Sequence, residues 1–394
     1  MKSEQTKLTA LNGMRVLDLT QVMSGPFATM QLADLGADVI KIENPIEGDQ
    51  TRRSWGNVED TGDSLAFISL NRNKRSISLN LKDPIDLQKF YSLVPSADVV
   101  IENWRPGVAS RLKVDWETLK KINPRLVYAS ISGFGQTGPY ANRPGYDLIA
   151  QAMGGAMSIT GEVGGNPVKC GIPIGDLGAG LFATIGVLAA YISAKETGVG
   201  QYVETSLFES VVSLAVWEST EYWRTGETPQ ALGSANRMSA PYQAVQSSNG
   251  YFVVGANNQG LWKKFCEILD VQGLESDERF STNNDRMANT KELIAEIEKR
   301  TINDTSENWV DRFLSNGVPA GPIVDYRHVF DTDPQVKARE MIVNVEHPVL
   351  GQVKVLNSPI KMGGTPISIR LAPPILGQHN KEIFAKETSM EPLE

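Results

Sequence analysis

One aspartate stands between glycines just before the longest uncharged stretch of the sequence. It is Asp176 in Ile174–Gly180, and residues 177–194 after it carry no charge. An aspartate at a helix start commonly accepts hydrogen bonds from free backbone N–H groups as an N-cap. The same place suits a nucleophile, because a helix N-terminus favours the ionised carboxylate and an unperturbed aspartate has a pKa of roughly 3.9. The glycines would leave room for a bulky electrophile. Both hypotheses stay open on these residues alone.

The histidines do not suit a hydrolytic site near Asp176. The three, His328, His347 and His379, all lie in the last fifth of the chain. A Ser-His-Asp or Cys-His enzyme needs one of them in its site, and the sequence has neither GxSxG nor HExxH. We therefore expect no metal site and no imidazole base. An ionised carboxylate needs no such base.

A glycine-rich segment, Gly133–Gly138, matches GxGxxG directly after a predicted strand. A dinucleotide site also requires a helix opening at the third glycine and an acidic residue about 20 positions on. A loop that contains Pro139 and Pro144 follows instead. The segment thus favours close approach of the backbone to some other ligand at the carboxyl end of a strand.

The densest positive charge lies in Asn71–Arg75, with Arg52 and Arg53 before it and Lys82 after it. One interpretation is a solvated turn before a strand. The other is a site for a polyphosphate ligand, because Arg and Lys donate to phosphate oxygens. Nucleotide hydrolysis has no support, since GxxxxGK[ST] is absent.

The elements that would position these residues alternate between strand and helix over the first two hundred residues. The predicted strands are 14–19, 38–43, 76–81, 97–101 and 125–130, with helices at 27–35 and from 83 onward. This alternation indicates βαβ units and a mostly parallel sheet with both faces covered.

The pattern changes after residue 204. Helical spacing predicts a long helix from about 208 to 226. Strands at 242–245 and 251–254 flank a hairpin turn, and helices at 290–301 and 307–316 follow. We predict a separate smaller α+β unit at 227–325, after which a helix (326–339) and a strand (341–345) return to the first pattern.

The composition is that of a globular protein. The 394 residues are 41% apolar and 21% charged, so a core forms without a disulfide or metal. The net charge of −8 disfavours nucleic acid and anionic lipid as partners. Only Cys170 and Cys266 occur, and two cysteines without a CxxC motif disfavour a structural zinc or a disulfide framework. Residues 177–194 include three glycines, so we expect a buried core helix and not a membrane span. The start of the chain shows no signal-peptide pattern, and we expect a cytoplasmic protein.

Several ordered blocks of the sequence resemble the family III CoA-transferases, a group that includes formyl-CoA transferase, carnitine CoA-transferase and α-methylacyl-CoA racemase. The blocks are LNGMRVLDLTQVMSGPFATMQLADLGADVIKIENP, NRNKRSISLNLKDP, ADVVIENWRPG, NPRLVYASISGFGQTGPYANRPGYD, GDLGAG, ALGSANRMSAPYQ and ILGQHNKEIF. Together they span nearly the whole chain.

The resemblance implies an α/β fold with a Rossmann-like large domain built from residues 1–226 and 326–394 around the small domain at 227–325. It implies an interlocked homodimer, and acyl-CoA and a small carboxylic acid as substrates, with no tightly bound cofactor. It places the catalytic role on Asp176 and substrate contacts on Gln136 and Tyr146. The CoA contacts that it implies are Val22, Met23, Ser24, Asn44, Leu79, Lys82, Asn103, Trp104, Arg111, Gly133 and Phe134. Many family members have arginine where this chain has Asn44, so another side chain would pack near the adenine.

The implied reaction passes through an aspartyl anhydride and an aspartyl-CoA thioester. We expect backbone N–H groups of 133–138 and 175–180 to stabilise the oxyanion. The loop at 233–236 could close over the site. Arg143, Arg224 and Arg237 are each either a clamp for a second carboxylate or a surface charge.

Two alternatives to a CoA-transferase stay open. In the racemase pattern a histidine lies thirty residues before the aspartate, and here that position is Tyr146, a poor base at neutral pH. The second alternative is a non-catalytic acyl-CoA-binding subunit, which the intact Asp176 and its glycines disfavour.

Overall fold

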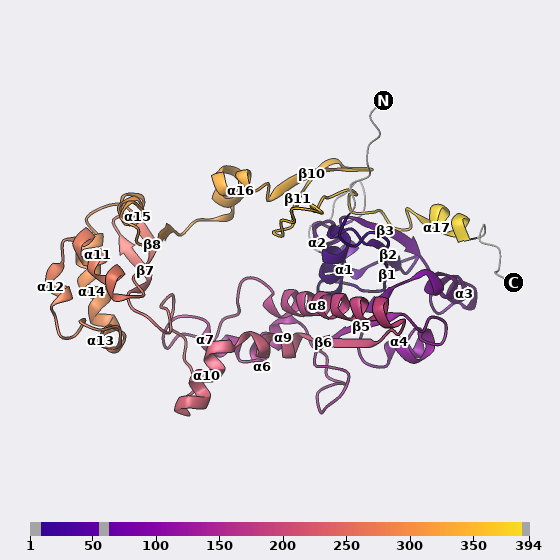
Figure 1. Ribbon diagram of the computed structural model, residues 1–394, viewed down its shortest axis with the longest axis horizontal. Coiled ribbons are helices and arrows are strands. Elements are labelled where there is room, and N and C mark those ends of the chain that lie inside the picture. The colour runs from indigo at the N-terminus through magenta and orange to yellow at the C-terminus, as the bar shows by residue number, and fades with distance from the viewer. Residues whose placement is uncertain (1–8, 55–62, 388–394) are drawn as a thin grey trace. The chain divides into compact units, whose positions relative to one another are not determined.

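The computed structural model describes residues 9–54 and 63–387 (Figure 1), and these form two compact units. The first unit takes in the described parts of 1–156, 169–224 and 334–394. The second consists of 157–168 and 225–333. The segment 157–168, which the sequence analysis assigns to the large domain, thus belongs to the second unit, and that unit ends at 333 where we predicted 325.

The first unit is built on a six-stranded parallel sheet with the strand order β3-β2-β1-β4-β5-β6. Its strands are β1 (Arg15–Asp18), β2 (Asp38–Glu43), β3 (Lys74–Ser78), β4 (Val99–Glu102), β5 (Val127–Ser132) and β6 (Tyr202–Ser206). This confirms the predicted α/β class with a parallel sheet. The order reverses between β1 and β4, and in such sheets ligands bind at the carboxyl ends of the strands at this switch point.

Alternating apolar residues bury both faces of the sheet. Val16, Val39 and Val99 belong to one hydrophobic core, and their neighbours Leu17, Ile40 and Val100 belong to the other. The first core lies under α1 (Ser24–Asp34), α6 (Asp147–Met153), α8 (Ile174–Thr197) and α9 (Leu207–Leu214). The second lies under α3 (Pro84–Leu93), α5 (Trp116–Leu119) and α17 (Asn380–Glu387).

Helix α8 carries Asp176 in its first turn and runs along the sheet (Figure 1). By length and composition alone it could cross a membrane, but the core helix of a soluble protein passes the same test. Its residues Ala179, Ala183 and Val187 are buried in the first core. A Cβ on Gly180 would lie 2.7 Å from the backbone oxygen of Ser24, so glycine at this position lets α8 approach α1 closely.

Several predicted elements differ from the structure, and three of them are as follows. Strand β3 begins at Lys74, two residues earlier than predicted. The long helix expected at 208–226 is divided into α9 and α10 (Val216–Thr225), because Ala215 has φ −79° and ψ 54°. The helix expected at 326–339 becomes a π-helical turn, η3 (His328–Thr332), and α16 (Pro334–Ala338). Pro334 disfavours helical geometry at the residue before it, and Asp333 has ψ 122°.

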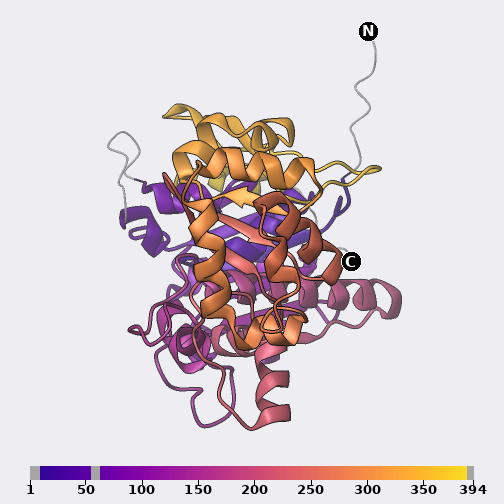
Figure 2. The same cartoon turned by 90° about the vertical axis from the view of Figure 1, so that its left-hand side faces the viewer.

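The second unit, whose orange helices are best seen in Figure 2, is a smaller α+β structure. Its antiparallel sheet contains the predicted hairpin, with strands β7 (Tyr242–Ser247), β8 (Gly250–Gly255) and β9 (Ala320–Pro322). Phe252, Phe265 and Phe313 form part of its core. Its helices are α11 (Gln259–Leu269), α12 (Gln272–Glu275), α13 (Asn283–Ala288), α14 (Thr290–Thr301) and α15 (Ser306–Ser315).

The other elements are short. In the first unit they are η1 (Gln50–Arg53), α2 (Leu65–Leu70), η2 (Val94–Ser96), α4 (Val108–Arg111) and the hairpin β10 (Ile342–His347) and β11 (Gly351–Leu356). In the second unit lies most of α7 (Ala156–Ile159). Helix α7 begins at the boundary between the two units.

Candidate active site

A cavity of about 130 Å³ lies at the carboxyl ends of β1, β4 and β5, beside the switch point of the sheet. Asp176 and Tyr146 line this cavity, which we call the nucleophile cavity. Six of the predicted CoA contacts line it as well: Val22, Met23, Ser24, Asn103, Trp104 and Gly133. The structure therefore gathers the predicted nucleophile and more than half of the predicted CoA contacts in one place.

Side-chain hydrogen bonds fix the loops that follow β1 and β4. The Asn103 amide accepts from the N–H of Gln21 at 2.8 Å and donates to its carbonyl at 2.7 Å. Val22 has φ 69°, a strained conformation for a β-branched residue, and its N–H donates to Asp49 Oδ1 at 3.1 Å. The N–H of Trp104 donates to the buried Glu102 carboxyl at 2.7 Å. The wall of the cavity is thus held before any ligand binds.

Asp147, and not Asp176, accepts hydrogen bonds at the start of α8. Its Oδ1 lies 2.8 Å from the N–H nitrogen of Gly175 and 3.4 Å from that of Asp176. The N-cap residue of α8 is Pro173, so the N-cap hypothesis for Asp176 is wrong. The N–H groups of Gly175 and Asp176, two of those expected to stabilise an oxyanion, donate to Asp147 in this structure. The expectation for the other N–H groups of 133–138 and 175–180 stays a prediction.

The carboxyl group of Asp176 is harder to ionise than an ordinary aspartate. Burial and the nearby Asp147 charge raise the pKa of Asp176 to about 7, although a hydrogen bond with Ser24 acts in the opposite direction. The sequence argument expected the helix N-terminus to favour the anion. In the structure Asp147 has taken up that N-terminus and adds a like charge, so the anion is disfavoured.

Two further cavities adjoin the nucleophile cavity through shared lining residues. We call the three together the CoA groove, after the predicted contacts that line them. The middle cavity, of about 220 Å³, shares Trp104 with the nucleophile cavity and is lined by the predicted contacts Asn44, Leu79 and Lys82. The outer cavity, of about 410 Å³, shares Lys82 with the middle one. Arg111 and Lys113 also line it. The groove thus runs from the carboxyl of Asp176 to three basic side chains.

Two predicted contacts line none of the three cavities of the CoA groove. Phe134 is buried and packs against Tyr140 and Phe208, with ring centroids 5.9 Å apart in both pairs. Gln136 donates to Ser130 Oγ at 2.8 Å. It lines a neighbouring cavity that also contains Glu102. The placement of Gln136 gives no support to a contact with the acid substrate.

The basic cluster forms internal ion pairs instead of a phosphate site. Arg52 pairs with Glu43 at 2.7 Å and with Asp63 at 2.8 Å. Arg72 pairs with Asp34 at 2.6 Å, and Lys74 with Asp18 at 3.1 Å. These three basic side chains are almost fully buried, so both interpretations of the cluster, the solvated turn and the phosphate site, are wrong for them. The exposed Lys82 alone among these bases lines the CoA groove.

The histidines of the first unit take part in other contacts. The Nδ1 atom of His379 accepts from the N–H of Ser76 at 3.1 Å. The Nδ1 atom of His347 accepts from Val349 and Leu350. Neither lines the nucleophile cavity. Over residues 9–54 and 63–387, no group of three or more His, Cys, Asp or Glu side chains is placed to hold a metal ion.

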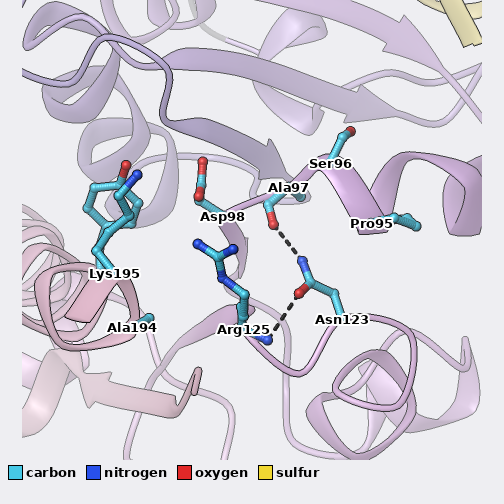
Figure 3. Close-up of a pocket in the computed structure, with 9 residues that line it drawn as sticks. Pro95, Ser96, Ala97, Asp98, Asn123, Arg125, Ala194 and Lys195 are labelled. Carbon is cyan, nitrogen blue, oxygen red and sulfur yellow. Dashed lines mark hydrogen bonds between the residues drawn. The ribbon is translucent and has the colours of Figure 1, made fainter. Parts of the chain in front are cut away.

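A separate cavity of about 130 Å³ lies at the amino ends of β4 and β5, whereas the nucleophile cavity lies at their carboxyl ends. Figure 3 shows the residues that line this separate cavity. Asp98, Arg125 and Lys195 line it. Asn123 donates to the carbonyl of Ala97 at 2.8 Å and accepts from the N–H of Arg125 at 3.0 Å (Figure 3). None of the predicted site residues lies in this cavity.

Two residues of the site were missed by sequence reasoning. Asp147 lies directly after Tyr146, at the end of one of the sequence blocks that resemble the family. No local signal links it to helix α8, which starts 27 residues later. Arg105 follows Asn103-Trp104 and lines the nucleophile cavity. Its place directly after two predicted contacts was the available signal.

An α/β sheet with a carboxylate at its switch point and cations along the adjoining cavities is typical of proteins that bind an anionic ligand at this edge. The sequence matches the model of CoA-transferase family III over residues 11–380, and the chain belongs to that family. It is 38% identical to the succinyl-CoA:glutarate CoA-transferase of Homo sapiens, with 97% of this chain and 87% of the relative covered. It is 40% identical to the succinyl-CoA:mesaconate CoA-transferase of Haloarcula marismortui, covering 95% and 96%. A crystal structure of a CaiB/BaiF family protein from Brucella suis superposes with a TM-score of 0.85 at 38% identity, covering 96% of this chain and 99% of that one. The chain is therefore a CoA-transferase.

Proposed function

We propose that this protein transfers CoA from an acyl-CoA such as succinyl-CoA to a free dicarboxylic acid, with Asp176 as the covalent nucleophile. The observation that carries the proposal is the course of the CoA groove, which begins at Asp176 and ends at Lys82, Arg111 and Lys113. Thioester and phosphates lie at opposite ends of CoA, and the groove offers a partner for each. Glutarate and mesaconate, the acids in the names of two relatives, are dicarboxylic acids.

The first half of the proposed reaction loads CoA onto the enzyme. The Asp176 carboxylate attacks the thioester carbonyl carbon, the C–S bond breaks, and CoA leaves as a thiolate. The resulting mixed anhydride is attacked by that thiolate at the aspartyl carbonyl. The C–O bond breaks, the donor acid leaves as a carboxylate, and an aspartyl-CoA thioester remains.

The second half repeats these steps in reverse with another acid. The acceptor carboxylate attacks the aspartyl thioester, CoA thiolate leaves, and a new anhydride forms. The thiolate then attacks the acceptor's acyl carbon and releases Asp176 as a carboxylate. No proton moves in either half, which agrees with the absence of His347 and His379 from the nucleophile cavity.

The raised pKa of Asp176 suits a nucleophile. With a pKa of about 7 this carboxylate is more basic than an ordinary aspartate and still ionised in roughly half of the molecules at neutral pH. Ser24 can hold its orientation through their hydrogen bond. A racemase would need a second acid/base group, and the residue at the position of the racemase histidine is Tyr146, which lines the same cavity.

The proposed working form is a homodimer. Helices α8, α9 and α10 expose large apolar side chains that a monomer would leave in water. These side chains are Ile185, Ile192, Val212, Trp217 and Trp223. Light scattering at micromolar concentration tests this proposal, and a monomeric mass contradicts it.

The nucleophile is tested by trapping. Wild-type protein mixed with succinyl-CoA and no acceptor should gain the mass of CoA less one water on the peptide that contains residue 176. Asp176→Ala should gain nothing and transfer nothing while CoA still binds by calorimetry. Asp311→Asn, at an exposed position on α15, is the matched control and should behave as wild type. Transfer by Asp176→Ala at the wild-type rate would refute the mechanism. Transfer by the purified wild-type chain alone excludes a merely non-catalytic subunit.

A further inference from the structure

We propose that Arg143 binds the second carboxylate of the dicarboxylic substrate and so determines the preference for diacids over monoacids. This inference rests on the proposed function and adds to it the residue that recognises the acid. It starts from the two guanidinium groups, of Arg105 and Arg143, that line the nucleophile cavity.

The guanidinium of Arg143 is held in place by an aromatic ring. Its Cζ atom lies 4.0 Å from the centroid of the Tyr140 ring, and its backbone N–H donates to the carbonyl of Tyr140 at 2.9 Å. Stacking orients the planar group and leaves the N–H donors at its edge available for a planar anion. An arginine arranged in this way can donate two parallel hydrogen bonds to one carboxylate.

The positive charge of Arg143 has no counter-charge within the part of the chain that the structure describes. The buried cations discussed above, Arg52, Arg72 and Lys74, each pair with a carboxylate. Arg143 is exposed and forms no such pair. Burial, Asp147 and Ser24 account for the shift of Asp176, so Arg143 is not paired with the nucleophile either.

Arg143 lies at the Asp176 end of the groove, so the part of the substrate that it would contact is the acyl group and not the CoA phosphates. The pantetheine arm separates the phosphates from the thioester, and three bases at the far end of the groove are available to them. A cation that shares a cavity with Asp176 faces the acyl carbon and what is attached to it.

Arg105 is the weaker candidate of the two. It also lines the neighbouring cavity, where the carboxyl groups of Glu102 and Asp115 lie. Arg105 thus lies between two cavities and has acidic neighbours in the second one. Arg143 does not line that second cavity.

The charges in the cavity explain why a diacid needs this arginine. The distal carboxylate of a bound diacid enters a site that already contains Asp147 and Asp176. A guanidinium offsets that repulsion, whereas a neutral distal group would leave the arginine unpaired. Donor and acceptor acyl groups occupy the same place in the two half-reactions, so one arginine serves both succinyl-CoA and the acceptor.

The test compares acids that differ only in the distal charge. Glutarate is paired with its monoamide, and kcat/KM for the acceptor is measured with succinyl-CoA as donor. Because both acids react with the same aspartyl-CoA intermediate, the ratio of their kcat/KM values reports only on the acceptor. We expect wild type to prefer the diacid by about 10- to 100-fold, the range of a charge-assisted hydrogen bond.

The variants then assign the preference to one side chain. Arg143→Gln should bring the ratio close to 1, chiefly by raising KM for the diacid, and Arg143→Lys should give an intermediate ratio because it keeps the charge without the paired donors. Arg125→Gln, which removes the same charge at the cavity in Figure 3, should keep the wild-type ratio.

Three results overturn the inference: a wild-type ratio near 1, an Arg143→Gln variant that slows acid and monoamide equally, or one that raises KM for succinyl-CoA alone. Absence of transfer to every acid by the wild-type chain refutes the proposed function itself.

Discussion

Replacing Asp147 by asparagine should move the pH dependence of the first half-reaction to lower pH. Burial and the charge of Asp147 together raise the pKa of Asp176 to about 7. Asparagine removes the charge but keeps an oxygen that can accept from the N–H of Gly175, as Asp147 does at 2.8 Å. The substitution thus tests electrostatics with little change in shape.

The magnitude follows from the ionised fraction of Asp176. At pH 6 a group with a pKa of about 7 is ionised in roughly one molecule in ten. Loss of a like charge at this separation should lower the pKa of Asp176 by about one unit, which makes the ionised fraction at pH 6 roughly one half. The rate at pH 6, relative to the plateau at high pH, should therefore rise about fivefold, even if the plateau itself falls because the nucleophile is less basic.

The assay is the pH profile of kcat/KM for succinyl-CoA, because that quantity reports ionisations of the free enzyme. Wild type should lose activity below a midpoint near 7, and Asp147→Asn should show a lower midpoint. Asp311→Asn is the control for a change of one surface charge. An unchanged or higher midpoint in Asp147→Asn, in protein whose melting temperature shows that it is folded, would refute the proposed cause of the shift.

Three further predictions follow from the ion pairs and the groove. The pKa of Asp176 rises from 3.8 to about 7 on folding, so the folded state holds the proton more tightly and wild type loses stability as pH rises from about 4 to 7. Asp176→Asn avoids this loss of stability, which amounts to up to about 4 kcal/mol. Its melting temperature should exceed that of wild type at pH 8, and the difference in melting temperature should shrink toward pH 4. A difference that stays constant with pH would contradict this prediction. Lys74→Met leaves the buried Asp18 without its partner and should lower the free energy of urea unfolding by about 3–5 kcal/mol; an unchanged midpoint would show the pair to be dispensable. Lys82→Gln and Arg111→Gln should each raise KM for succinyl-CoA up to about tenfold. They should leave KM for succinyl-pantetheine unchanged, because that substrate lacks the CoA phosphates. Equal effects on both substrates would place these side chains away from the phosphates.

Local patterns were sufficient to predict the parallel sheet and the place of the nucleophile. Strand β2 was predicted with the bounds that the structure has, because its alternating faces are both buried and its ends are marked by Gly36 and Pro45. Asp176 stood out through its flanking glycines, and Gly180 is one of the residues that let α8 approach α1. These features depend on neighbours a few positions away.

Features that depend on distant partners could not be predicted in this way. A dense basic segment indicates a ligand site only if its charges are unpaired, and the partners of Arg72 and Lys74 lie 38 and 56 residues earlier in the chain. Their carboxylates on α1 and β1 meet the bases only after the sheet has formed.

The amino-acid sequence alone determined the order of strands, helices and glycines. With that order it also determined that an acidic side chain lies at the start of α8. Only the tertiary structure decided how that side chain ionises, because its pKa depends on burial and on Asp147, which lies 29 residues away in the chain. The physical reason is that propensity and periodicity act between near neighbours, whereas solvation and Coulomb interactions depend on distance in space.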